Sequence, residues 1–311
     1  MRYQDHSPDW ESFLERLNQA ATTEFPVPEM AVGGVDASIF GMPRSGTTAL
    51  YQLLAMTGTV GYPSNLMAMF WRVPWVGARL QVQLASSGPT LSVESVAGRT
   101  REPLDPHEFG YFWRAALGHS GNTLDRDRPG WPIDQLRLVL AAVHDVFGAP
   151  VTYKNFLAPS HMQELVTGLP SMRFVATRRP LVDVAGSMLH VRRTVGVASG
   201  DVFGTVPRGF ALPDSGTEFD IVATQLVGLE RDLRAVDAQR EVLFVDYPQL
   251  CSEPRTVVTR VLQFLEIEEA EQQVLRSIPP HLPEGHGLNQ LSVQDKQELL
   301  EAVERAQEVA S

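Results

Sequence analysis

The sequence is poor in cysteine, in basic residues and in clustered metal ligands. Cys251 is the single cysteine among 311 residues, so no disulfide can form within the chain, and no Cys/His cluster offers a zinc site. The 26 Lys and Arg residues against 37 Asp and Glu residues leave a formal charge of −11. Such a charge repels polyanions and argues against nucleic acid as the main partner.

Long apolar runs are also scarce. Residues 1–18 are charged and polar, and no later stretch approaches the roughly 18 apolar residues of a membrane span. Apolar residues still make up 43% of the chain and charged residues 20%, which is the balance of a soluble globular protein. Together with the single cysteine, these features predict a cytoplasmic protein without a signal peptide or a membrane span.

Apolar runs of strand length alternate with helix-like stretches along most of the chain. The predicted strands are 37–40, 151–154, 173–177 and 241–245, and the predicted helices include 49–56, 133–147, 161–166, 182–191, 219–238 and 292–309. Alternating strands and helices predict an α/β fold, in which helices cover both faces of a mostly parallel central sheet.

The two ends of this pattern differ in character. A first amphipathic helix is indicated by four apolar residues at helical spacing, Trp10, Phe13, Leu14 and Leu17. A Pro-containing linker follows it, so we expect residues 1–35 to form an N-terminal helical arm and residues 36–311 to form a single domain. The Gly- and Pro-rich segment 195–217 is predicted to be a loop or lid.

The first predicted strand runs into a glycine-containing loop, Gly41-Met-Pro-Arg-Ser-Gly-Thr-Thr48, and then a helix. This is the spacing of a phosphate loop, with Thr47 at the usual lysine position. Backbone N–H groups from Arg44 to Thr48 can converge on one anion at the helix start, and Arg44 adds a cation. The missing lysine weakens a kinase or ATPase interpretation. The alternative is a tight turn with a surface arginine.

A second candidate anchor lies where the strand 173–177 runs into Arg178, Arg179 and Pro180, before a helix that carries Ser187. An arginine at a strand end and a hydroxyl on the next helix can clamp a second phosphate. The alternative is that both arginines are solvated loop charges and that Ser187 merely lies on a helix face.

In this order along the chain, the two motifs resemble those of the sulfotransferases that use 3′-phosphoadenosine 5′-phosphosulfate (PAPS), and the bacterial branch most closely. The resemblance runs in patches from about 38 to 265 and includes 245–254, similar to a V-x-Y-E-D-L-x-x-x-P segment. It also includes 64–71, similar to a stretch that bacterial members place near the acceptor cleft, although a buried helix has the same composition. The resemblance implies a P-loop-like sulfotransferase fold, PAPS as sulfate donor and no required metal.

The resemblance also assigns roles in donor binding. It implies that the 5′-phosphate and the sulfuryl oxygens are held by Arg44, Ser45, Gly46, Thr47 and Thr48. It implies further that the 3′-phosphate is held by an arginine and Ser187. The family places this serine eight positions after the arginine, whereas Ser187 is nine after Arg178 and eight after Arg179. We favour Arg178, because it keeps the Arg-x-Pro spacing, and Arg179 remains the alternative.

Sulfuryl transfer to an alcohol needs cations around the moving group and a base for the hydroxyl proton. Lys154 resembles the family lysine that contacts the bridging oxygen of the donor, and Phe156 stands where cytosolic members have a catalytic histidine. Bacterial members carry an acidic segment that resembles 102–113. Glu108 is therefore the first candidate base and His107 the second. The alternative is a solvated loop acid beside aromatic side chains that belong to the core.

These observations predict a sulfotransferase that moves the sulfuryl group of PAPS to the hydroxyl of a carbohydrate, a lipid or another small-molecule alcohol. A P-loop kinase is the alternative enzyme. A non-catalytic nucleotide-binding module is the alternative from another class, because the family histidine is replaced by Phe156.

Overall fold

The computed structural model describes residues 7–29, 31–85, 91, 100–214, 216–234, 236, 242–267 and 275–310. Its centre is a parallel sheet of four strands, β1 (Asp36–Gly41), β2 (Thr152–Lys154), β3 (Met172–Arg178) and β4 (Val242–Asp246), in the order β2-β1-β3-β4. Parallel register is continuous from Ala37 opposite Thr152 to Arg178 opposite Asp246. The predicted α/β fold with a parallel central sheet is confirmed.

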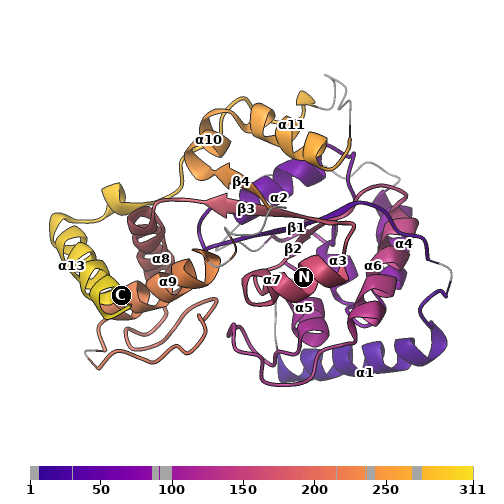
Figure 1. The fold of residues 1–311 in the computed structure, drawn as a ribbon, viewed down its shortest axis with the longest axis horizontal. Coiled ribbons are helices and arrows are strands. Elements are labelled where there is room, and N and C mark those ends of the chain that lie inside the picture. The colour runs from indigo at the N-terminus through magenta and orange to yellow at the C-terminus, as the bar shows by residue number, and fades with distance from the viewer. Residues whose placement is uncertain are drawn as a thin grey trace.

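Helices cover both faces of this sheet (Figure 1). Buried side chains such as Ile39, Val175 and Val245 pack toward the helices α2 (Thr47–Met56), α10 (Tyr247–Ser252) and α11 (Pro254–Phe264). On the other face, Phe40 and Phe174 pack toward a larger layer. That layer contains α5 (Gly110–Leu117), α6 (Ile133–Phe147), α7 (Ala158–Gly168), α8 (Leu181–Val195) and α9 (Glu218–Arg234). The alternation of strand side chains thus produces two cores, one on each side.

Proline and glycine set the ends of the long helices near the sheet. Helix α6 begins after Pro132 and ends before Gly148, which has φ +62°, and α8 begins after Pro180 and ends before Gly196, which has φ +73°. Proline before a helix and left-handed glycine after it are usual boundary signals. Helix α6 has its predicted bounds, whereas α8 continues four residues beyond its predicted end at Val191.

The N-terminal helix α1 (Pro8–Glu24) packs through one side on residues 69–72, which follow α3 (Asn65–Ala68). Its buried Asn18 donates a 2.7 Å hydrogen bond to the carbonyl of Met69, and Glu15 pairs with Arg72 at 2.6 Å. A helix is confirmed at this position, but two of the four apolar residues that indicated its buried face, Trp10 and Phe13, are exposed and stack on each other. The division into an arm and one domain stays a prediction.

At the opposite end of the molecule, α13 (Val293–Ala310) lies along α8 and α9 (Figure 1). Its buried Leu299 and Val303 face the core, and Arg305 pairs with Asp220 of α9 at 2.8 Å. Within the described part of the chain, every helix is too short or too polar to cross a bilayer.

Candidate active site

The carboxyl ends of the parallel strands meet at one edge of the sheet and open into a cleft of about 410 Å³. The cleft is lined by Ile39, Phe40, Gly41, Met42, Pro43, Arg44, Thr47, Thr48, Glu108, Asn122, Lys154, Phe156, Met188, Val202, Phe203, Gly204 and Thr205. Ligands of parallel α/β sheets bind at this edge. Residues that the sequence placed in separate motifs, Arg44, Glu108 and Lys154, therefore share one cavity.

The loop between β1 and α2 is held in shape from within. The buried hydroxyl of Ser45 donates to the carbonyl of Met42 at 2.7 Å and lies 2.6 Å from the hydroxyl of Thr177 on β3. Gly46 has φ +96°, and a Cβ there would meet the ring of Tyr247 at 2.5 Å, so glycine is required. Ser45 thus shapes the loop with its side chain, while α2 starts with its N-terminus beside the cleft.

Arg44 connects the two motifs that the sequence suggested. Its backbone lies in the loop after β1 with φ +66°, and its Nε donates to the hydroxyl of Ser187 on α8 at 3.3 Å. Burial lowers the pKa of Arg44, and the positive charge of Arg179 lowers it further. A guanidinium in this position can contact anions bound either at the start of α2 or beside Ser187.

The two neighbouring arginines Arg178 and Arg179 lie in different surroundings. Arg179 donates to the carbonyls of Arg44, Gly285 and His286 at 3.0, 3.2 and 2.9 Å, and its guanidinium stacks on the ring of Tyr247. Arg178 is exposed at the end of β3, with its guanidinium 3.4 Å from the ring centroid of Phe244. Arg179 is therefore a clamp for backbone carbonyls, and Arg178 is the arginine on the surface beside α8.

Lys154 supplies an ammonium group where the loop has none. It ends β2, its side chain is only 11% exposed, and its Nζ donates to the hydroxyl of Thr48 at 3.0 Å. The same Nζ lies 3.3 Å from Oε1 of Glu108. A lysine from the neighbouring strand thus lies beside the start of α2, although Thr47 stands at the lysine position of the loop.

Glu108 points into the cleft, and His107 is engaged elsewhere. Phe109 has φ +59°, which bends the chain sharply just after Glu108, and its N–H donates to Nδ1 of His107 at 2.8 Å. The aromatic side chains Phe109 and Phe112 are buried in the core. Glu108 itself is 42% exposed and faces Lys154. The neighbouring aromatics are therefore core residues, and what distinguishes this carboxylate is the lysine opposite.

One wall of the cleft comes from the segment predicted to be a loop or lid, although none of its residues was named as a candidate site residue. Within the described residues of 195–217 no helix or strand follows the end of α8, as predicted, and Val202 to Thr205 line the cleft. Buried Gln225 of α9 holds this wall by donating to the carbonyls of Phe203 and Thr205 at 2.8 and 2.6 Å. Asn122 joins it, because Val206 N–H donates to the Asn122 carbonyl at 2.9 Å. A Gly- and Pro-rich composition predicts a loop, but it does not predict which part of the fold that loop packs against.

The stretch 64–71 does not line the cleft, in contrast to its expected place near the acceptor. Ser64 caps α3 by accepting from Met67 N–H at 3.2 Å, and buried Asn65 donates to the carbonyl of Glu102 at 2.7 Å. Its Met and aromatic side chains are those of a buried segment. In the part of the chain that the structure describes, no group of three or more His, Cys, Asp or Glu side chains could hold a metal ion.

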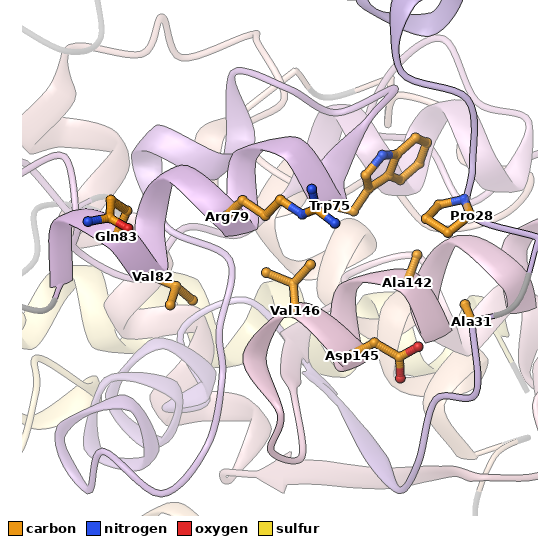
Figure 2. A pocket seen from close by; sticks show the side chains of 9 residues that line it. All are labelled: Pro28, Ala31, Trp75, Arg79, Val82, Gln83, Ala142, Asp145 and Val146. Carbon is orange, nitrogen blue, oxygen red and sulfur yellow. The ribbon is translucent and has the colours of Figure 1, made fainter.

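A larger cavity of about 560 Å³ lies between α4 (Pro74–Ala85), α6 and the linker after α1 (Figure 2). It is away from the carboxyl ends of the strands, which point toward α8 (Figure 1). Its carboxylate, Asp145, accepts from the backbone N–H groups of Val32 and Gly33 at 2.9 and 3.0 Å. This side chain holds the linker in place, and Arg79 projects into the cavity beside Trp75.

Comparisons with known proteins place these features in one family. Residues 37–271 match the sulfotransferase family. The fold is similar to the crystal structure of sulfotransferase STF9 from Mycobacterium avium, with a TM-score of 0.63, 14% identity, and coverage of 94% of this chain and 80% of that one. Sulfotransferase STF1 from Mycobacterium tuberculosis H37Rv gives a TM-score of 0.49 and 15% identity over 91% of this chain and 81% of that one. Among curated proteins, none is significantly similar.

Proposed function

The chain belongs to the sulfotransferase family, and we propose that it transfers the sulfuryl group of PAPS to the hydroxyl group of an acceptor alcohol. The observation that carries this proposal is the convergence of Lys154 on both Thr48 and Glu108, at 3.0 and 3.3 Å, inside the cleft at the strand ends. A cation beside an anion-binding helix start, with a carboxylate opposite, matches what sulfuryl transfer requires.

The donor occupies two anion sites in this proposal. The start of α2, with its backbone N–H groups and the hydroxyls of Thr47 and Thr48, binds the 5′-phosphosulfate. Ser187 and Arg178 bind the 3′-phosphate, a role supported by the contact of Ser187 with Arg44 and by the engagement of Arg179 with three carbonyls. Arg44 neutralises charge between the two sites.

In the transfer step, the acceptor oxygen forms a bond to sulfur while the bond between sulfur and the bridging oxygen breaks. Negative charge develops on that bridging oxygen as the nucleotide leaves, and the Lys154 ammonium stabilises it. Glu108 takes the proton of the acceptor hydroxyl. The Phe109 N–H on Nδ1 of His107 supports Glu108 over His107, because this ring nitrogen already acts as an acceptor.

The acceptor in this proposal is a carbohydrate, a lipid or another small-molecule alcohol. The walls of the cleft beyond the phosphate loop are apolar at Phe156, Met188 and Phe203, and polar at Asn122 and Thr205. Such walls favour an alcohol whose hydroxyl is next to an apolar part, since few polar groups fix orientation while apolar surface supplies most of the affinity.

Calorimetry with 3′-phosphoadenosine 5′-phosphate and with adenosine 5′-phosphate tests the donor. We expect the nucleotide without the 3′-phosphate to bind more weakly by about 1.5–3 kcal/mol, the range for a charge-assisted hydrogen bond. Equal affinity would contradict the 3′-phosphate site.

Transfer assays test the reaction, with PAPS and a panel of phenols, alkanols, sterols and sugars. Transfer of a phosphoryl group from magnesium ATP to an alcohol of the panel, with no use of PAPS, would establish a kinase instead. Nucleotide binding without transfer to any alcohol of the panel, and without hydrolysis of PAPS, would favour a non-catalytic module.

A further inference from the structure

Two histidine rings stack on each other beside the second anion site. His190 lies on α8 three positions after Ser187, so the two side chains share one helix face. His286 comes from the segment before η1 (Leu288–Gln290), and its ring lies 3.7 Å from that of His190, centroid to centroid, with 22° between the planes. His190 is half-buried and His286 is exposed.

The segment that carries His286 is fixed against α8. A Cβ on Gly186 would meet the backbone of Gly287 and Leu288 at 2.7 Å, so glycine permits this close approach. Asp183 accepts from Leu288 N–H at 3.2 Å, and Arg179 donates to the carbonyl of His286. The histidine stack is therefore built by the fold and is not a chance contact of two surface rings.

Positive charge gathers at this stack. The pKa of His190 is lowered by burial and then by the charges of His286 and Arg44. Arg44 in turn donates to the hydroxyl of Ser187 at 3.3 Å, and the positive charge of Arg179 lowers the pKa of Arg44.

Among the other charged groups of these elements, Asp183, Arg192 and Arg193 are engaged, and Glu284, two residues before His286, is an exposed carboxylate. The carboxylate of Asp183 accepts from the backbone of Leu288, and Arg193 at the end of α8 pairs with Glu218 and Asp295 at 2.7 and 2.8 Å. An anion between Arg44 and the stack would thus meet cations and imidazoles.

We propose that His190 and His286 form an imidazole wall of the site for the 3′-phosphate, and that His190 takes up a proton from solvent when that phosphate binds. This inference rests on the proposed function, because it needs the donor nucleotide beside Ser187. A phosphate dianion favours the imidazolium form of a neighbouring histidine, and the ring of His286 then stacks on that cation. No covalent bond changes, and the proton comes from the buffer.

Calorimetry in two buffers of different ionisation enthalpy measures this proton. Above about pH 7 a phosphate monoester is already a dianion, since its second pKa is about 6, so uptake there reports on the protein. We expect up to one proton to be taken up with 3′-phosphoadenosine 5′-phosphate, and affinity to fall with rising pH by up to about tenfold per pH unit. Adenosine 5′-phosphate, which lacks the 3′-phosphate, should bind without uptake.

His190→Gln should abolish the uptake and flatten the pH dependence of binding. The matched control is His281→Gln, because His281 is exposed in the same segment and bonds the carbonyl of Ser252, so this variant should keep the wild-type uptake. His286→Gln, at an exposed position, should reduce the uptake and serves as a second variant if His190→Gln unfolds at a lower temperature.

The outcomes separate this inference from the proposed function. If the 3′-phosphorylated nucleotide binds tightly and wild type, His190→Gln and His286→Gln take up the same number of protons, the histidine wall is wrong and the donor site stands. Equal uptake with both nucleotides would also overturn it. If neither nucleotide binds, the proposed function fails, and this inference fails with it.

Discussion

The cleft at the carboxyl ends of the strands is smaller than the cavity between α4 and α6, at about 410 against about 560 Å³. The two cavities differ in what their charged side chains contact. In the larger cavity, Asp145 accepts from two backbone N–H groups and holds the linker. In the cleft, Lys154 and Glu108 face each other next to the start of a helix. Size therefore does not identify the candidate active site, whereas a lysine and a carboxylate that face each other beside a helix start distinguish it from the other cavity.

A second pair near the amino ends of the strands sharpens the contrast. Asp36 at the start of β1 accepts from His144 at 2.7 Å and from Val151 N–H at 2.7 Å, and its side chain is 6% exposed. Glu108 is 42% exposed opposite Lys154. A buried carboxylate with a backbone donor is a structural element, while the half-exposed carboxylate of the cleft stays accessible to a substrate proton.

Glu108→Gln should produce the largest effect. If Glu108 takes the acceptor proton, the variant binds the donor normally but loses about 10²–10⁴ in turnover, the usual contribution of a general base. The acidic limb of the pH–rate profile should disappear as well, because that limb reports protonation of the base. His107→Ala should retain turnover; a large loss there, with an active Glu108→Gln, would transfer the role to His107.

Lys154→Ala and Arg44→Ala should come next. Each removes a cation proposed to stabilise charge around the transferred group, so we expect turnover to fall by about 10²–10³ with a smaller loss in product-nucleotide affinity. Arg79→Ala is the matched control from the other cavity and should leave turnover unchanged. Near-normal turnover in either cleft variant would remove that residue from the reacting centre.

The smallest effect is expected at the amino end. The bond to Asp36 raises the pKa of His144 above its ordinary value of 6.5. A histidine whose pKa is raised in the folded state stabilises the folded protein fully below pH 6.5. This stabilisation is lost as the pH rises through the pKa of the folded state. His144→Gln should lower the free energy of unfolding by about 1 kcal/mol at pH 6, the worth of one hydrogen bond, without changing turnover. Urea titrations from pH 6 to pH 9 measure the free energy of unfolding and its pH dependence. If the variant keeps the pH dependence of the wild type, this assignment is contradicted.

Much of the fold could be predicted because its signals are local. The strand at 37–40 and the helix at 133–147 reappear as β1 and α6, since short buried strands are continuous apolar runs and proline and glycine terminate helices. The helices α4 and α5 were not predicted. The sequence of α5, Gly110–Leu117, reads as a run of aromatic side chains, and only its packing in the core distinguishes a helix from a loop.

The candidate site also has a part that could be predicted from the sequence and a part that could not. The loop after β1 could be predicted because its glycine spacing is a local pattern. The contact of Arg44 with Ser187, the carbonyl clamp of Arg179 and the wall formed by Phe203 all join residues far apart in the sequence. Such contacts depend on how helices pack on the sheet. The sequence could therefore name Arg178 and Arg179 as candidates, but it could not predict that Arg179 binds backbone carbonyls while Arg178 is exposed.

The manner in which the wall over the cleft is held has an evolutionary consequence. Buried Arg192 of α8 donates to the carbonyls of Ala198, Ser199 and Asp201, at 3.1, 3.3 and 2.5 Å, and Gln225 binds two further carbonyls of the loop. Both anchors grip the backbone, which every residue type possesses. Side chains at 202, 203 and 205 can therefore be exchanged without releasing the loop. If the cleft binds donor and acceptor as proposed, acceptor preference can change at these positions while the residues proposed to bind the donor stay the same.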